Sequence, residues 1–463
     1  MHIEEDCVGR MALPDDVLYG VHAARAAVNF PFKQATHPQL IAALLTIKKA
    51  AALTNMRGGT LAATKGQAIV AACDELLTGA HAEAFIVPAI QGGAGTSTNM
   101  NVNEVVAHLA TRNTGLAIHP NDDVNQGQST NDVYPSAGKI AALRLLPGVL
   151  SAISDLQEAL LAKAKAYRDV IKVGRTQLQD AVPTTYGKVF SAYAHMFDRD
   201  LRRLRFAADA LREMALGGTA IGTGINASAY YQQHIVAELS VQSGLQLRQA
   251  ADLSDGIQNT DALAEFSGAF KALAINLNKL SNDLRLLASG PQAGLGELQL
   301  PARQAGSSIM PNKINPVIPE AVNQVAFAVI GNDVAITMAT QNGQLELNAF
   351  EPLAFAKLYE DEEELTTAMQ ILSAFCVQDI KVNAAVCRHA VEHSAVAATV
   401  LAPYIGYQAT TQLIKTALAE HRSVRQLIVE KDLLPQETVD RLFSNAALLG
   451  QDIETNKLRA TGR

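Results

Sequence analysis

One segment of the chain, Gly306 to Glu320, gathers the side chains with the greatest capacity for chemistry and reads GSSIMPNKINPVIPE. A residue before proline is pushed out of helical geometry, so Lys313 and Asn315 alternate on an extended stretch where together they can grip a carboxylate. The Pro-Glu pair at its end is typical of the first turn of a helix, whose amide dipoles add positive potential. We expect a loop that moves and then closes on an anion. The alternative is a turn that the serines cap.

Three further segments place glycine beside hydroxyl and amide groups. They read GGAGTSTNMNVNE at 92–104, GQSTND at 127–132 and GRTQLQDAVP at 174–183. Neutral donors of this kind can bind an anion without a net charge. Each segment taken alone is equally well explained by helix capping, but their joint occurrence favours a binding site. The glycines at 92–95 lack the lysine and spacing of a phosphate-binding loop, so no nucleotide site is expected.

The loop from Gly306 to Pro316 resembles the signature loop of the fumarase/aspartase superfamily. The other three segments are similar to the remaining active-site regions of that superfamily, in the same order. The resemblance covers nearly the whole chain, from IEED at 3–6, through GGTAIGTG at 217–224, to SVR at 423–425. Within the superfamily, the aspartate ammonia-lyases are the most similar branch.

The resemblance implies a carbon–nitrogen lyase that converts L-aspartate to fumarate and ammonia by anti elimination through an enediolate (aci-carboxylate) intermediate. Ser307 is the expected general base, acting as an alkoxide once the loop closes over a dry, electropositive pocket. The other implied contacts surround the substrate. They are Thr96, Ser129, Thr130 and the backbone of Ser308 at the β-carboxylate, Lys313 and Asn315 at the α-carboxylate, Asn131, Thr176 and Gln177 around the amino group, and Met310 in the loop. No metal ligand and no required cofactor are expected, and activation by a divalent cation is left open.

The same resemblance implies a mainly α, three-domain fold with a long central helical bundle. It also implies a homotetramer in which four such bundles form a twenty-helix core. Each active site is then shared by three subunits, so that scattered polar segments of different chains converge on one small-molecule substrate.

A fumarate hydratase of class II type is the nearest alternative. Fumarases resemble this chain at 174–176 but continue with histidine, a water-activating group, where this chain has Gln177, and some aspartases have histidine there too. The residues after Asn315-Pro316 read VIPE, as in aspartases, where fumarases typically have Thr-Gln-Cys before the glutamate. A lyase that acts on another substituted succinate is a further alternative. A catalytically inactive tetramer that serves as a scaffold is disfavoured, because Ser307, Lys313 and Asn315 of the loop are intact.

One stretch departs from the family pattern. The family commonly reads Asn-Asp-His-Val-Asn where this chain has NDDVN at 121–125, so Asp123 replaces a histidine, and Gln126-Gly127 replaces a lysine and a small residue. The local charge becomes more negative. Either anion binding near this loop is weakened, or the change is a tolerated surface substitution.

Long helices must position these segments. Apolar residues recur three and four apart without a break from Leu263 to Leu287, which predicts a coiled-coil-like helix that ends at Ser289-Gly290-Pro291. Similar stripes at 149–160 and 193–211 predict two more helices.

Helical patterns dominate the centre of the chain, where strand patterns and hairpin turns are scarce, and this predicts a long bundle. The chain is richer in turns before it and forms shorter helices after it. We therefore expect an N-terminal domain at 1–132, a central helical bundle at 133–386 and a small helical C-terminal domain at 387–463.

The composition of the chain limits the kinds of partner that it is expected to bind. Against 45 acidic residues the chain has 38 basic ones, for a net charge of −7, and no block of like charges suggests nucleic-acid or membrane binding. The N-terminus MHIEED is unlike a secretory signal, and we expect no apolar run long enough to span a bilayer, so a cytoplasmic protein is expected. The four cysteines are expected to be reduced, packed thiols.

Overall fold

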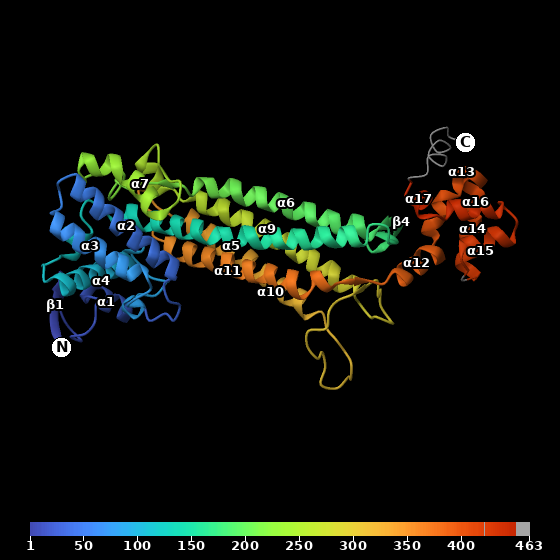
Figure 1. Ribbon diagram of the computed structural model, residues 1–463, viewed down its shortest axis with the longest axis horizontal. Helices are drawn as coiled ribbons and strands as arrows, with labels where there is room; N and C mark the ends of the chain where they lie inside the picture. Colours follow the sequence, from blue (N-terminus) through green and yellow to red (C-terminus); the bar gives the residue numbers. More distant parts are fainter. Residues whose placement is uncertain (421, 451–463) are drawn as a thin grey trace. The chain divides into compact units, whose positions relative to one another are not determined.

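The computed structural model describes residues 1–420 and 422–450, and most of them are helical (Figure 1). The chain divides into two compact units. Unit 1 comprises Met1–Ser151, Asp200–Ile275 and Val325–Thr367. Unit 2 comprises Ala152–Arg199, Asn276–Gln324 and the described residues of Ala368–Arg463. The mainly α fold expected from the sequence is confirmed.

Five long helices contribute a segment to each unit. They are α5 (Thr130–Ala166), α6 (Tyr186–Ala210), α9 (Asp261–Leu287), α10 (Val317–Gln341) and α11 (Glu351–Phe375). The predicted seam lies on α9, where its apolar side chains from Leu263 to Leu284 are buried. Within unit 1, Asp333 of α10 accepts hydrogen bonds from Ser267 and Lys271 of α9. The seam therefore packs as a bundle helix, and the prediction of long central helices is confirmed.

The rest of unit 1 surrounds the beginning of α5. Its elements are β1 (His2–Asp6), β2 (Gly9–Leu13), α1 (Val21–Asn29), α2 (Pro38–Arg57), α3 (Ala63–Leu77), η1 (Ala82–Ala84), α4 (Thr96–Thr114), η2 (Pro120–Val124), β5 (Glu213–Met214), α7 (Ala229–Ser243), β6 (Arg248–Gln249) and α8 (Leu253–Gln258). Strands β1 and β2 form an antiparallel hairpin, and α2 packs against α3 and α7. Proline at the first position of α2 and the His37 ring, which accepts from Gln39 N, fix where that helix begins.

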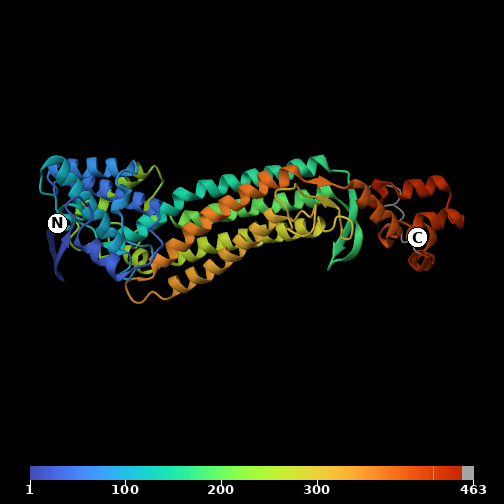
Figure 2. The ribbon, with the colours of Figure 1, turned by 90° about the horizontal axis from the view of Figure 1, so that it is seen from below.

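Unit 2 holds two small antiparallel sheets and a cluster of short helices. Its further elements are β3 (Ile171–Thr176), β4 (Gln179–Thr185), β7 (Leu298–Gln299), η3 (Val377–Asp379), β8 (Lys381–Val382), α12 (Ala384–His393), η4 (Ala395–Val400), α13 (Ala402–Ile405), α14 (Tyr407–Glu420), α15 (Val424–Glu430), α16 (Gln436–Leu442) and α17 (Asn445–Leu448). The short helices share one core, to which Ile171 and Val173 of β3 contribute. Figure 2 shows the β3–β4 hairpin where α5 ends and α6 begins.

The expectations for hairpins, domain divisions and cysteines have different outcomes in the structure. We expected few hairpins in the centre of the chain, and the β3–β4 hairpin, whose strands pair antiparallel, was not predicted. The two units cut through five helices, so the domain divisions at residues 133 and 387 stay predictions. All four cysteines are free, but only Cys73, Cys376 and Cys387 are buried, whereas Cys7 is exposed.

Two helices, α5 and α10, are long and apolar enough to cross a membrane by length and composition alone. Both helices carry scattered polar residues, so neither contains an uninterrupted apolar run of that length. In the most apolar window of α5, 61% of the residues are buried inside the protein, against 33% in α10. A core helix of a bundle passes the same test.

Candidate active site

The loop that carries Ser307 connects β7 to α10 and stands away from the helices of unit 2 (Figure 1). Its neck is closed by two hydrogen bonds: Gly306 N donates to the Lys313 carbonyl at 2.8 Å, and Asn315 Nδ2 donates to the Gly306 carbonyl at 2.9 Å. Residue 312, an asparagine, turns the chain with a φ of 61°. The predicted extended stretch at 313–316 has no regular secondary structure, and helix α10 follows it, close to where Pro319 predicted a helix start.

The Ser307 hydroxyl lies inside this loop, where two backbone amides converge on it. Ile309 N lies 3.1 Å and Met310 N lies 3.0 Å from Ser307 Oγ. Both groups donate to the oxygen, so they stabilise negative charge on it. This arrangement favours the alkoxide that a serine base requires.

Four candidate residues lie in unit 1, where α4 and α5 begin. Thr96 is the first residue of α4, and a Cβ added to Gly95 would lie 2.3 Å from the Tyr134 ring of α5, so the two helix starts are in close contact. Thr130 Oγ1 accepts from Asn99 Nδ2 of α4 at 3.0 Å. Two neighbouring helix N-termini make this region electropositive through their aligned peptide dipoles.

Ser129 and Asn131 complete this cluster. Ser129 Oγ accepts from Asn131 N at 3.2 Å, and Asn131 Nδ2 donates to the Ala220 carbonyl at 2.9 Å. Asp132, which follows them, is fully buried and accepts from the backbone N–H of Ser129. Burial raises the pKa of Asp132 to about 7, although its backbone hydrogen bonds act in the opposite direction.

A buried lysine lies beneath these residues. Lys48 of α2 donates to Asn125 Oδ1 at 2.9 Å and to Gln128 Oε1 at 2.8 Å. Asn99 also donates to Asn125 Oδ1, at 3.3 Å, which links the lysine to the partner of Thr130. Burial lowers the pKa of Lys48 to about 7, and the nearby Asp132 carboxylate opposes that shift. Sequence reasoning missed this residue.

Thr176 and Gln177 lie at the tip of the β3–β4 hairpin in unit 2 and are exposed. Gln177 and Leu178 both have positive φ, 52° and 62°, as the two-residue turn of a hairpin requires. Neither residue is a glycine, so the turn carries backbone strain, which is frequent at functional sites.

Glu297, one residue before β7, anchors this hairpin. Its buried carboxylate receives Arg175 Nη1 at 2.5 Å, Lys172 Nζ at 3.2 Å and the Tyr186 hydroxyl at 2.8 Å. Its carbonyl accepts from Asn383 N at 2.8 Å. The strand that leads to the Ser307 loop and the hairpin that carries Gln177 are therefore held by one carboxylate, which the sequence did not single out.

The candidate residues therefore fall into two sets. Thr96, Ser129, Thr130 and Asn131 belong to unit 1, and the remaining ones, Thr176, Gln177, Ser307, Ser308, Met310, Lys313 and Asn315, belong to unit 2. Neither unit contains all of the candidate residues. Several of the polar side chains are exposed and have no hydrogen-bond partner in the part of the chain that the structure describes, among them Gln177, Ser308 and Lys313.

The departure at Asp123 has a structural explanation. Asp123 is buried, receives Lys65 Nζ at 2.7 Å, and accepts from His119 N at 2.8 Å. The interpretation as a tolerated surface substitution was wrong, because the carboxylate is paired inside the protein. Its charge is balanced by Lys65, so the local surface does not become more negative.

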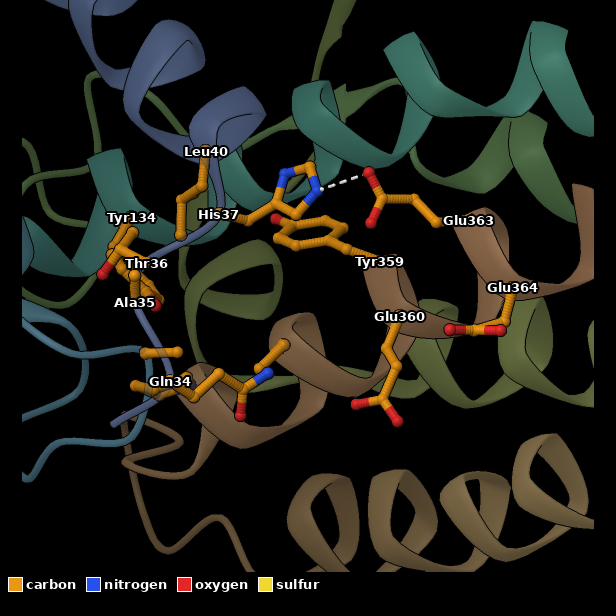
Figure 3. Close-up of a pocket in the computed structure, with 13 residues that line it drawn as sticks. Gln34, Ala35, Thr36, His37, Leu40, Tyr134, Tyr359, Glu360, Glu363 and Glu364 are labelled. Atoms are coloured by element: carbon orange, nitrogen blue, oxygen red, sulfur yellow. Dashed lines mark hydrogen bonds and ion pairs between the residues drawn. The ribbon is translucent and has the colours of Figure 1, made fainter. Parts of the chain in front are cut away.

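A cavity of about 160 Å³ in unit 1 is shown in Figure 3. Its lining includes His37, whose ring bonds Glu363 at 3.1 Å, together with Glu360 and Glu364. None of the candidate residues lines it, and its carboxylates would repel a dicarboxylate. Among residues 1–420 and 422–450, no group of three or more His, Cys, Asp or Glu side chains is placed to hold a metal ion.

Comparison with known families gives two matches. Residues 9–331 match the family described as lyase, and residues 398–450 match the family described as fumarase C C-terminus. The first match spans the segments at 92–104, 127–132 and 174–183 as well as the whole Ser307 loop.

Curated relatives are similar over nearly their whole length. An aspartate ammonia-lyase of Pseudomonas aeruginosa is 47% identical over 94% of this chain and 94% of its own. One of Helicobacter pylori is 45% identical over 97% of this chain and 98% of its own, and one of Bacillus subtilis is 43% identical over 96% and 94%.

Solved structures are similar in fold. A fumarate lyase:delta crystallin from Brucella melitensis bound to cobalt has a TM-score of 0.94 at 44% identity, covering 97% of this chain and 99% of that chain. A recombinant class II fumarase from Schistosoma mansoni has a TM-score of 0.93 at 34% identity, covering 97% of this chain and 100% of that one.

Proposed function

Because this chain belongs to the lyase family of the fumarase/aspartase superfamily, we propose that it catalyses the reversible deamination of L-aspartate to fumarate and ammonia. It is a carbon–nitrogen lyase, like the relatives that are named aspartate ammonia-lyase. The observation that carries the proposal is the pair of backbone amides at 3.1 and 3.0 Å from Ser307 Oγ.

The reaction needs a base because the proton on Cβ of aspartate is very weakly acidic. The Ser307 alkoxide takes that proton, and the electron pair moves onto the β-carboxylate, which becomes an enediolate. When the enediolate collapses, the carbon–carbon double bond forms and the C–N bond breaks. The amino group is protonated in bound aspartate, so it leaves as neutral ammonia.

The remaining candidate residues contact different groups of the substrate. Thr96, Ser129, Thr130 and the backbone N–H of Ser308 donate to the β-carboxylate, and their bonds strengthen as charge develops there. Lys313, whose ammonium is unpaired among the described residues, binds the α-carboxylate with Asn315. Asn131, Thr176 and Gln177 surround the amino group, and Met310 provides an apolar contact from the loop.

The proposal includes a homotetramer whose active sites are shared by three subunits. Helix α10 supports it: Phe327, Val334 and Met338 lie on one face and are 58%, 57% and 56% exposed. Such a stripe is typical of a helix that packs against another chain. The separation of the candidates into two sets, with exposed members, is the other support. A cytoplasmic location belongs to the same proposal, and the four free thiols are consistent with a reducing compartment.

The test is the ultraviolet absorbance of fumarate after the purified protein is added separately to L-aspartate and to L-malate. The expected result is a rise with aspartate that falls by about 100-fold or more in Ser307→Ala. Ser308→Ala is the matched control, because it keeps the backbone N–H that the proposal uses, and it should lose far less. A rise with malate alone would make the protein a fumarate hydratase. If the absorbance rises with neither substrate, the remaining alternative is a lyase for another substituted succinate.

A further inference from the structure

Asp132 connects two segments of unit 1 that are far apart in the sequence. Its side chain is fully buried, and it lies immediately after Ser129, Thr130 and Asn131. One carboxylate oxygen accepts from Ser129 N at 2.9 Å. The other accepts from two amides of a glycine-rich loop that is 85 and 87 residues away, Gly217 N at 3.1 Å and Thr219 N at 3.0 Å.

The loop that Asp132 holds is strained at the point of contact. Thr219 has a φ of 57°, in the left-handed region, which is costly for a β-branched residue. Its amide points at Asp132. An internal anion that receives this amide offsets the strain, so removal of the carboxylate should let residue 219 relax.

The loop in turn supports a candidate substrate contact. The Ala220 carbonyl, one residue after Thr219, accepts from Asn131 Nδ2 at 2.9 Å. This bond fixes the side-chain amide of Asn131. A shift of residues 219–220 would therefore rotate Asn131, and loss of the bond to Ser129 N would loosen the turn that presents the Ser129 and Thr130 hydroxyls.

We propose that Asp132 is a positioning residue of the active site: its carboxylate joins the first turn of α5 to the 217–220 loop and thereby aims Ser129, Thr130 and Asn131 at the substrate. The inference rests on the proposed function for the identity of that substrate. Asp132 touches neither aspartate nor fumarate, and its effect passes through the three residues that it orients. Two charged or titratable groups face it from neighbouring elements, Lys48 and Tyr231.

The unit offers a matched control. Glu104 of α4 is also buried and also accepts from three backbone amides, Gly20 N at 2.9 Å, His22 N at 2.8 Å and Ala23 N at 3.2 Å. These amides belong to the start of α1, which carries no candidate residue. The Glu104→Gln and Asp132→Asn substitutions remove the same kind of contact, but the amides that Glu104 holds belong to no candidate residue, whereas Asp132 holds the amide of Ser129 itself.

The experiment compares Asp132→Asn, Asp132→Glu and Glu104→Gln in the full-length protein by thermal unfolding, by steady-state kinetics with L-aspartate and by hydrogen–deuterium exchange. We expect Asp132→Asn to lose about 10- to 100-fold in kcat with a KM within about threefold, because a group that is misplaced by an ångström acts mainly in the transition state. Exchange should become faster in peptides that cover 215–222 and 129–134. Asp132→Glu should recover protection only in part, and Glu104→Gln should lose thermal stability while keeping kcat within about twofold of wild type.

Two results would overturn the inference. One is a folded Asp132→Asn protein with unchanged kcat; the other is a kcat loss in Glu104→Gln as large as in Asp132→Asn, because both effects would then reflect stability alone. A wild-type protein that is inactive on aspartate would instead refute the proposed function, and the exchange data would still report whether Asp132 holds the two segments together.

Discussion

The Asn315 side chain donates to the Gly306 carbonyl at 2.9 Å and so closes the neck of the loop that carries Ser307. Gly306 has no room for a side chain, since an added Cβ would lie 2.6 Å from the Lys313 carbonyl oxygen and 3.0 Å from Asn315 Cγ. Gly306→Ala should therefore open the neck and move Ser307 from its two amide donors. We expect kcat to fall by about 10- to 100-fold with little change in thermal stability, as measured by fumarate release and thermal unfolding.

Gly148→Ala is the control for that substitution. Gly148 lies in α5, where an added Cβ meets only a Thr366 methyl group at 3.9 Å, an ordinary contact. This variant should keep wild-type activity and be equally or slightly more stable, because alanine is the better helix former. A Gly306→Ala protein as active as Gly148→Ala would show that the closed neck has no role in catalysis.

Lys48 should make the stability of the protein depend on pH. Its pKa is about 7 in the folded protein because of burial, against an ordinary value of 10.5. Between these values the unfolded chain binds more protons than the folded one, so the free energy of unfolding should rise with pH across this window, by about 1.4 kcal/mol per pH unit and subunit at most. Urea unfolding at a series of pH values from neutral to alkaline measures it.

Lys48→Met should remove that slope. It should also lower stability at alkaline pH, because Gln128 Oε1 loses its donor, at a cost of about 1–3 kcal/mol. Asn125 Oδ1 keeps Asn99 and Asn103 as donors, so its loss should be smaller. Lys49→Met is the neighbouring control, since Lys49 pairs with the half-exposed Asp74 at 2.6 Å. If wild type and Lys48→Met show the same slope, the ammonium is not deprotonated by folding.

A sequence predicts features that depend on a local pattern, but not those that depend on long-range contacts. The seam on α9 was predictable because apolar residues that are three or four apart in the sequence determine which face of the helix is buried. Lys48 carries no such signal. Its hydrogen-bond partners lie 77 and 80 residues away, so no local pattern in α2 singles it out. Asp132 had a partial signal, since Ser129 and Asp132 match the capping-box spacing, but its link to Thr219 spans 87 residues.

The β3–β4 hairpin was missed for a local reason. Gly174 interrupts β3, and Pro183 stands in β4, so neither strand shows the alternation that predicts a sheet. In the structure Gly174 lies against the Val182 carbonyl, where an added Cβ would be 2.5 Å from the oxygen, and the strand register shifts between Val173 and Arg175. Gly174 therefore obscures the strand pattern in the sequence, and the same residue allows the hairpin to bend.

The Glu297 network should be essential to folding of that hairpin. Glu297→Gln would leave Lys172 and Arg175 without their carboxylate, and both cations are largely buried, with side-chain exposures of 6% and 19%. We expect a loss of about 3–5 kcal/mol and faster hydrogen exchange over 171–185. Tyr186→Phe removes one hydrogen bond from the same carboxylate and should cost only about 1 kcal/mol. Equal losses in the two variants would contradict the role of charge in this network.

The Lys65–Asp123 pair should behave as a coupled unit. Asp123 is 8% exposed, so Lys65→Met leaves a buried carboxylate with only the His119 N–H as its donor. The Lys65 side chain is 37% exposed, and solvent screening limits the expected loss to about 1 kcal/mol. Lys65→Met/Asp123→Asn should recover part of that loss, because the neutral amide needs no counter-charge. A double-mutant cycle of unfolding free energies measures the coupling, and additive losses from the two single substitutions would show that the lysine is not what allows an acid at position 123.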